Sequence, residues 1–443
     1  MTSTTKSPPV KYNKTGFPDF LPVGRMELMK ETGCFDFEMQ TYQSIVGLGF
    51  PKAKLKGCFC LVLFSIGILF SGQAQDSIRI RKTVRTLCAS GMAGRGYTRN
   101  GHLKASAFIG KTFSQIGLAA PEGNFFQDFP IQQVVFYKAP EFRLNGRRLI
   151  PGRHFLPPPN ALFQKGTFRI IPSPDLKEGE FALTPQKQVE LQAPAFLKTT
   201  EKLTHTLRET PEGNLNWLVL KSALESGDSL AEIRVEGKWE QKLQSRNVLG
   251  MVKGRLFPEK FLVVCAHYDH LGSMGKVFFP GANDNASGIA LMLEMAREIA
   301  GNPLPYSVLF IAFGGEEAGL IGSRNYVDHP VVPLEKIRFV MNLDLMGFGG
   351  KGGTVVNATV FPKEFARLDS LNRTGGFLPE LKLRGKAANS DHYPFSERGV
   401  PAFFLYLMGG PGYYHDIDDR PETLDWKGLR GTFGLLMAFL RGF

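Results

Sequence analysis

Five short segments in the C-terminal half of the chain carry side chains that bind divalent metals. In chain order they are AHYDH, GANDNASG, GGEEAGL, NLDLMG and YYHDIDD. Their candidate ligands are His267, Asp284, Glu316, Glu317, Asp344 and His415. Two imidazoles with several carboxylates are typical of a zinc-type site. The set predicts a site for two divalent metals, with one acid left over to move protons.

The first two segments each have an ordinary explanation when taken alone. His267 follows five apolar residues, which also suits a buried histidine, and Asp269 could accept the second ring N–H. Asp284 precedes a predicted helix, where an acid is a common N-cap. If Asn285 is that cap, Asp284 is free to bridge two metals, which in such sites lie roughly 3.5–4 Å apart.

The adjacent pair Glu316–Glu317 carries the most information. Two neighbouring acids after a buried strand repel each other unless a positive charge lies near, and the helix dipole accounts for only one. One can bind metal while the other contacts the attacking water. Asp344 ends another apolar strand, where an unpaired carboxylate is costly. His415 lies in a Gly- and Tyr-rich loop, with Asp419 as its predicted orienting partner.

The elements around these residues alternate between strand and helix from Asn247 onward. Apolar runs predict strands at 247–254, 260–267, 306–313, 337–345 and 400–408, and helices at 286–300, 318–329 and 422–442. The fold class is therefore α/β, a three-layer sandwich with a mixed, mainly parallel central sheet. Ligands of such folds bind beyond the carboxyl ends of the strands.

The rest of the chain divides by composition. Residues 1–75 are an N-terminal extension with a signal peptide or anchor, and 76–139 open the catalytic domain with helices at 77–90 and 101–118, a loop at 91–101 and a strand at 124–137. Residues 140–245 are rich in Pro, Lys and Glu, with alternating runs such as AEIRVEG, and predict an inserted strand-rich module. Residues 246–443 are the metal-binding part of the catalytic domain.

The extension predicts export. The apolar run 58–71 follows Lys52, Lys54 and Lys56, and suits a signal-peptide core with cleavage after Ala74. Met39 would give such a signal its normal length, and the alternative is an uncleaved membrane anchor. We therefore expect a periplasmic or secreted protein that contacts a membrane only through this segment.

Composition and charge exclude some other classes. The 443 residues carry a formal net charge of +12, but the basic residues are scattered, which argues against nucleic-acid binding. The five cysteines show no disulfide or zinc-site spacing, and Cys265 in an apolar strand predicts a buried thiol.

At these segments the chain resembles the exported zinc aminopeptidases of the bacterial leucyl aminopeptidase and aminopeptidase Y family. That family also includes glutamate carboxypeptidase II and the glutaminyl cyclases. The resemblance covers Asn247 to the end, and more weakly 91–118. Position and length of 140–245 suit the family's protease-associated domain, although its glycine pattern is not evident. Asp416 stands where relatives usually carry Thr.

The resemblance implies a role for each candidate. His267 and Asp344 would bind one zinc, Glu317 and His415 the other, and Asp284 would bridge them. Glu316 would be the general base, Asp269 the support of His267, and Tyr414 a donor to the oxyanion. The peptide after Asp284 would be cis. SDHYPF, with Ser390, Asp391 and His392, matches a family segment near the substrate pocket.

Several functions remain open at the level of sequence. The preferred hypothesis is an aminopeptidase with two zinc ions that acts on peptides with a free N-terminus. A carboxypeptidase or dipeptidase specificity stays within that class, and cobalt or manganese could replace zinc. A single-zinc glutaminyl cyclase is disfavoured because His267 and Asp344 are both present. An inactive, receptor-like relative is disfavoured because every ligand and Glu316 are retained.

Overall fold

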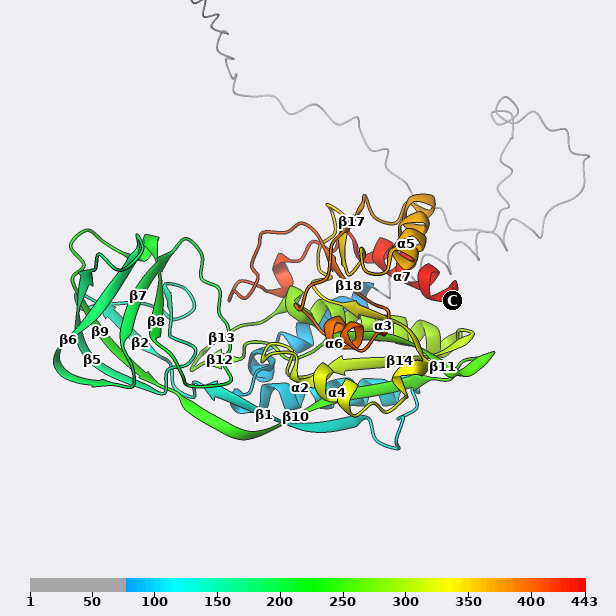
Figure 1. Cartoon of the computed structure of the whole chain (residues 1–443), viewed down its shortest axis with the longest axis horizontal. Coiled ribbons are helices and arrows are strands. Elements are labelled where there is room, and N and C mark those ends of the chain that lie inside the picture. Colours follow the sequence, from blue (N-terminus) through cyan, green and yellow to red (C-terminus); the bar gives the residue numbers. More distant parts are fainter. Residues whose placement is uncertain (1–76) are drawn as a thin grey trace, which may run out of the picture. The chain divides into compact units, whose positions relative to one another are not determined.

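The computed structural model describes residues 77–443, so the predicted signal segment, its cleavage site and the alternative start at Met39 lie outside the described residues. No helix within 77–443 is both long and apolar enough to cross a membrane. The described residues form a helix-covered sheet, which carries the candidate site, and a second sheet formed by the inserted module (Figure 1).

The central sheet has eight strands in the order β1-β10-β14-β11-β15-β18-β16-β17. They are β1 Phe126–Val135, β10 Lys238–Val252, β14 Tyr306–Phe313, β11 Phe257–His267, β15 Ile337–Leu343, β18 Ala402–Leu407, β16 Gly353–Val356 and β17 Leu381–Leu383. The inner strands β14, β11, β15 and β18 run parallel, while β1, β10 and β16 pair antiparallel with their neighbours toward the centre. The sheet is therefore mixed with a parallel centre, as the sequence predicts.

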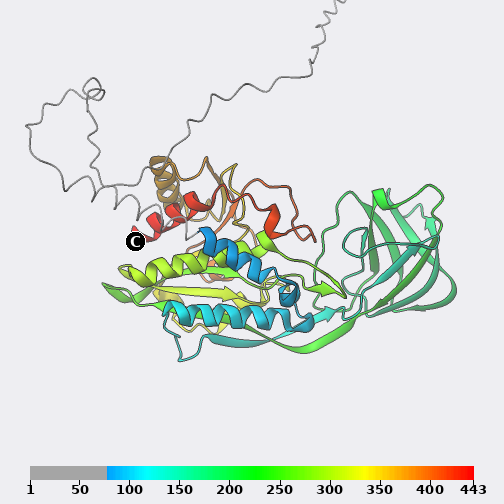
Figure 2. The same ribbon diagram turned by 180° about the vertical axis from the view of Figure 1, so that it is seen from behind.

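Helices cover both faces of this sheet because its inner strands are apolar on both sides. Along β11, Leu262, Val264 and Ala266 belong to one core cluster, and Val263 and Cys265 to the cluster on the opposite face. The first face carries a helix over 77–87, α2 Gly101–Ile116, α3 Ser287–Gly301, α5 Pro362–Gly375 and α7 Leu429–Arg441. The second carries α4 Ile321–Asp328 and α6 His392–Glu397. In Figure 1, α4 and α6 lie in front of the sheet. In Figure 2, which shows the opposite side, the helix over 77–87, α2 and α3 lie in front of it.

The inserted module forms an eight-stranded sheet of its own, in the order β3-β2-β9-β5-β6-β7-β8-β4. Its strands are β2 Glu141–Leu144, β3 Arg147–Arg148, β4 Phe155–Leu156, β5 Phe163–Pro172, β6 Glu180–Leu191, β7 Ala195–Thr200, β8 Leu215–Leu220 and β9 Leu230–Glu236. Phe142, Phe155 and Trp217 meet in its core with ring centroids 5.1–5.8 Å apart. The apolar alternation within 140–245 thus builds a separate hydrophobic core.

The module joins the central sheet through continuous strands. β10 begins at Lys238 and runs to Val252, so the predicted boundary at 245/246 falls inside one strand. β1 pairs with it antiparallel from Phe126↔Val248 to Val135↔Lys238. A short pair, β12 Ser273–Met274 with β13 Val277–Phe278, follows β11, and Met274 packs into the module's core.

Some predicted elements differ from those observed. The loop expected at 91–101 contains short 3-10 turns at Ser90–Arg95 and Thr98–Asn100. The last helix begins at Leu429 rather than near 422, after a 3-10 turn at Pro421–Thr423. The sequence did not predict α5, α6, β16 or β17, all of which fall in polar or short segments. Further 3-10 turns lie at Lys221–Ala223 and Leu334–Lys336.

Candidate metal centre

The carboxyl ends of the parallel strands bring the candidate ligands together. β11 ends at His267, which pairs in register with Phe313 at the end of β14, and Glu316 and Glu317 follow three and four residues later. Asp344 comes directly after β15, and Asp284 lies in a one-turn π-helix, Ala282–Ala286, before α3. His415 comes from the loop after β18. The side chains of His267, Asp284, Glu317, Asp344 and His415 are buried, and Glu316 is partly exposed.

The side chains form a continuous chain of contacts. His267 Nε2 lies 3.4 Å from Asp344 Oδ1 and 3.3 Å from Asp284 Oδ1. His415 Nε2 lies 3.3 Å from Asp284 Oδ2 and 3.1 Å from Glu317 Oε2. The two oxygens of Asp284 therefore face two different imidazoles, which is the arrangement a bridging carboxylate requires.

These spacings fit two metal ions. Ligand atoms bound tetrahedrally at zinc distances of 2.0–2.1 Å lie about 3.3 Å from one another. The four contacts of 3.1–3.4 Å match that separation. Asp344 Oδ1 is buried without a hydrogen-bond donor among the described residues, and such an atom is costly unless a cation faces it. The donor set, imidazole with carboxylate oxygen, also suits zinc.

The electrostatics of Asp284 favour its charged form. Burial opposes its ionisation, but hydrogen bonds with His267 and His415 hold its pKa well below the usual range. Burial raises the pKa of Asp344, which the charge of His267 counteracts. A ligand must be deprotonated to bind metal, and the lowered pKa of Asp284 keeps this carboxylate in that form.

Glu316 lies beside the first ligand group. Carboxylate or imidazole atoms of His267, Glu316 and Asp344 lie within 4.8 Å of one another. Burial and the nearby charges of Asp391, Glu317 and Asp344 raise the pKa of Glu316 well above its usual range, although His267 lowers it. A carboxyl with a raised pKa is suited to accept and return a proton near neutral pH.

Asp269 makes different contacts from those expected. Its backbone oxygen lies 3.2 Å from His267 Nδ1, whereas the nearest carboxylate oxygen is 4.0 Å away. The carboxylate instead accepts the amide N–H groups of Glu316 and Glu317 at 3.1 and 3.3 Å, and the hydroxyl of Tyr97 at 3.1 Å. Asp269 therefore supports His267 through its main chain and fixes the turn of the glutamate pair through its side chain.

The predicted partner of His415 is not the observed one. His415 Nδ1 donates to the backbone oxygen of His205, 2.8 Å away, and His205 N donates back to His415 O at 3.2 Å. The carboxylate of Asp419 instead accepts the amides of Asn283 and Asp284 at 2.9–3.1 Å. The orienting role expected of Asp419 is thus wrong for His415, because its carboxylate turns toward the Asp284 loop.

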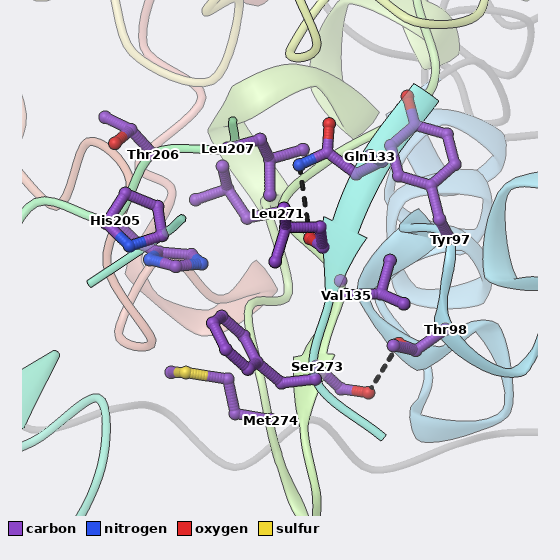
Figure 3. A pocket seen from close by; sticks show the side chains of 14 residues that line it. Tyr97, Thr98, Gln133, Val135, His205, Thr206, Leu207, Leu271, Ser273 and Met274 are labelled. Carbon is purple, nitrogen blue, oxygen red and sulfur yellow. Dashed lines mark hydrogen bonds between the residues drawn. The ribbon is translucent and has the colours of Figure 1, made fainter. Parts of the chain in front are cut away.

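The module's chain supplies this contact through the segment 202–209, which we call the strap. Lys202 Nζ donates to the backbone oxygens of Gly412 and Tyr414, and Gln133 Nε2 donates to Arg208 O at 2.8 Å. Figure 3 shows His205 and Leu207 of the strap facing Leu271 and Met274 across a cavity of about 20 Å³. The strap therefore lies against the loops that carry the site.

The loop of Asp284 is held from behind by a buried arginine. Arg95 is fully buried and donates to backbone oxygens of Leu87, Tyr268, Pro280, Gly281 and Asp284 at 2.6–3.2 Å. The Asp284–Asn285 peptide is cis, as the resemblance implies. Ala286 is the N-cap residue of α3, and Asn285 Oδ1 accepts the amide of Gly288 in its first turn at 3.0 Å, so the side chain of Asp284 is not used there.

Tyr414 and the SDHYPF segment each contact a candidate ligand. The ring of Tyr414 is about half exposed and stacks on His415, with centroids 3.8 Å apart. Ser390 Oγ lies 3.3 Å from Asp344 Oδ2 and accepts from Asn342 Nδ2 at 2.8 Å. His392 begins α6 and belongs to neither ligand group found in the described residues.

Sequence reasoning missed three residues of this site. His270 ends the AHYDH segment, and its Nδ1 lies 2.6 Å from Glu317 Oε1. A second histidine three residues after His267 was a signal that could have indicated it. Arg95 and His205 gave no such signal, because both act through backbone oxygens far away in the chain.

Comparisons with known proteins agree with this geometry. Residues 247–440 match the family described as peptidase family M28. Aminopeptidase YwaD of Bacillus subtilis is 33% identical over 215 residues, which cover 44% of each chain. A probable leucine aminopeptidase of Arthroderma otae is 29% identical over 43% of this chain and 55% of its own length. This chain thus spans about half the length of these relatives.

Solved structures show the same fold. BSAP, a zinc aminopeptidase from Bacillus subtilis, aligns with 82% of this chain and 94% of its own, with a TM-score of 0.60 and 21% identity. A peptidase M28 precursor from Shewanella amazonensis aligns with 85% and 95%, with a TM-score of 0.61 and 13% identity. Residues 76–139 and 246–443 together make up about 59% of this chain, so alignments over 82% and 85% extend into the inserted module.

Proposed function

We propose that this M28 protein is a dizinc aminopeptidase that works outside the cytoplasm and removes residues from the free N-terminus of peptides. The observation that carries the proposal is the unbroken contact chain Asp344–His267–Asp284–His415–Glu317, with Glu316 beside it. The relatives named as aminopeptidases support the reaction class. The apolar run at 58–71 supports export.

His267, Asp284 and Asp344 would hold one ion, and Asp284, Glu317 and His415 the other. When bound, zinc polarises a carbonyl and lowers the pKa of water. Glu316 takes the proton of the attacking water and passes it to the leaving amine. Tyr414 stands at the rim, where its hydroxyl can donate to the oxygen that becomes negative in the tetrahedral state.

The carboxylates around the two proposed ion positions can accept hydrogen bonds from the free amine of the substrate. An acetylated N-terminus has no amine to donate them and carries only a single amide N–H. A cavity of about 320 Å³ adjoins the site and is lined by apolar and aromatic side chains, among them Phe348, Tyr406, Met408 and Tyr414. This cavity supports a preference for substrates whose N-terminal residue has an apolar side chain.

The presence of both His267 and Asp344 favours this proposal over a single-zinc cyclase. A cyclase needs one ion, yet the contacts on both sides of Asp284 have the spacing of bound ligands.

The deciding experiment compares free and blocked substrates with and without metal. Purified protein is assayed on leucyl-nitroanilide and on the same compound with an acetylated amine, before and after dialysis against a chelator. We expect cleavage of the free compound only, loss with chelator and recovery with zinc. Activity that survives chelation, or cleavage restricted to the blocked compound, would overturn the proposal.

A further inference from the structure

Glu317 is contacted by two imidazoles, one at each carboxylate oxygen. His415 Nε2 approaches Oε2 at 3.1 Å, and His270 Nδ1 approaches Oε1 at 2.6 Å. His270 also lies 3.9 Å from Asp284 Oδ1, and atoms of His270, Asp284 and Glu317 lie within 4.8 Å of one another. The position of His270 therefore permits two roles, a metal ligand or a hydrogen-bond donor to Glu317.

The distances decide between these roles. Two atoms bound to one tetrahedral zinc lie about 3.3 Å apart. The 2.6 Å between His270 Nδ1 and Glu317 Oε1 is too short for that and has the length of a charge-assisted hydrogen bond. The 3.9 Å to Asp284 is longer than the spacing of two ligands. His415, in contrast, has ligand spacing to both carboxylates.

We propose that His270 is a positioning residue that donates its Nδ1–H to Glu317 Oε1, so that only Oε2 of this carboxylate is left to bind the second metal. The inference rests on the proposed dizinc site and deepens it. Without the donor, the Glu317 carboxylate could rotate or bind through both oxygens. Its orientation toward His415 Nε2 and Asp284 Oδ2 would no longer be fixed.

The surroundings hold the imidazole of His270 in one orientation. Its ring is fully buried, its amide donates to Arg95 O at 3.3 Å, and its edge meets the ring of His415 at a centroid distance of 5.9 Å. Gly281 leaves the space it needs, since a Cβ there would lie 2.4 Å from His270 Cδ2. His270 Nε2 is buried without a partner in the described residues, which fits a neutral ring with its proton on Nδ1.

Removing a hydrogen-bond partner of a metal ligand typically weakens metal binding 10- to 100-fold. We therefore compare the full-length protein with His270→Phe and His270→Asn. Phe keeps the ring and its edge contact with His415 but has no donor. Asn places its amide N–H close to the position of Nδ1. His329→Phe is the matched control, because His329 is exposed.

The measurement is zinc affinity, obtained by titrating the metal-free proteins against a chromophoric chelator, with bound zinc counted by elemental analysis. We expect the second zinc to bind about 10- to 100-fold more weakly in His270→Phe. The first zinc should be unaffected, and His270→Asn and His329→Phe should lie within about threefold of the unmodified protein. If His270→Phe fails to fold, His270→Leu takes its place.

Wild-type-like affinity in a folded Phe or Leu variant would overturn the inference. Weakening in Asn as large as in Phe would also overturn it, because the role would then need the imidazole itself. An unmodified protein that binds fewer than two zinc ions is a different result, which refutes the dizinc proposal and the inference with it.

Discussion

In the proposed mechanism, Asp284 and the pair Glu316–Glu317 have different roles. The two oxygens of Asp284 contact His267 and His415. Glu317 contacts His415 but not His267. Glu316 contacts neither histidine at the distance of two ligands of one metal ion. The amides of both glutamates donate to Asp269, which fixes their backbone, so their side chains diverge from a common turn. One change in this turn would therefore disturb metal binding and proton transfer together.

Glu316→Gln separates the two roles. The amide keeps the size of the side chain but cannot accept a proton from water. We expect two zinc ions to remain bound while kcat falls by roughly 10²–10⁴-fold, the usual contribution of general acid–base catalysis. Steady-state kinetics and zinc analysis of the same sample check this. A variant with near-normal kcat would remove Glu316 as the base.

The matched change at the neighbouring residue is Glu317→Gln. It should lower zinc content as well as turnover, since it weakens a ligand rather than a base. If Glu316→Gln loses as much zinc as Glu317→Gln, the proposed division of roles between the two glutamates is wrong.

Among the elements, the Asp284 loop depends on a turn far away in the sequence. Arg95 lies in the segment between the helix over 77–87 and α2, and it donates to the loop's backbone oxygens at Pro280, Gly281 and Asp284. Within residues 77–443, its guanidinium contacts only backbone carbonyls and, weakly, Cys88 Sγ. Its role in the described structure is therefore to hold the loop in shape.

Arg95→Met tests this dependence. Several buried carbonyls would lose their donors at once, at about 1–3 kcal/mol each. We expect the metal-free protein to lose at least about 3 kcal/mol of unfolding free energy in urea, or to fail to fold. Arg85→Met is the control, since Arg85 is exposed and such changes stay within about 0.5 kcal/mol. Equal stability of the two variants would contradict the role of Arg95.

The same elements show how far sequence alone reaches. β11 and β14 were predictable because a strand buried on both faces must be apolar throughout, and their ends then place His267 and Glu316. α5 was missed because only two of its residues are buried, which leaves a weak apolar pattern. The contacts of Asp269, Asp419 and His270 could not be predicted, since hydrogen-bond partners depend on how loops meet after folding.

For the whole molecule, buried titratable groups couple stability to pH in both directions. Burial lowers the pKa of His392 to about 4, so between pH 4 and 6.5 the folded state binds fewer protons there than the unfolded state. Its contribution to the unfolding free energy therefore falls on acidification. Burial raises the pKa of Asp391 and Asp419 to about 7, which acts in the opposite sense.

A comparison with His392→Gln isolates the histidine's share. Relative to the variant, the metal-free wild type should lose about 3 kcal/mol between pH 7 and 4, as a shift of that size implies. Urea unfolding at several pH values, with chelator present throughout, gives the difference. Parallel pH profiles for the two proteins would show that folding leaves the pKa of His392 unchanged, and would contradict the prediction.

The strap has a consequence for how this protein can be re-engineered. Its contacts with His415 use only main-chain atoms of His205: His205 O accepts from the His415 ring, and His205 N donates to His415 O. Almost any side chain can satisfy such contacts, provided that the backbone follows the same path. A foreign domain grafted in place of 140–245 could therefore share no sequence with the original and still sustain the site. A graft that closed the gap by a shorter route would leave His415 without its acceptor, even with every candidate ligand in place.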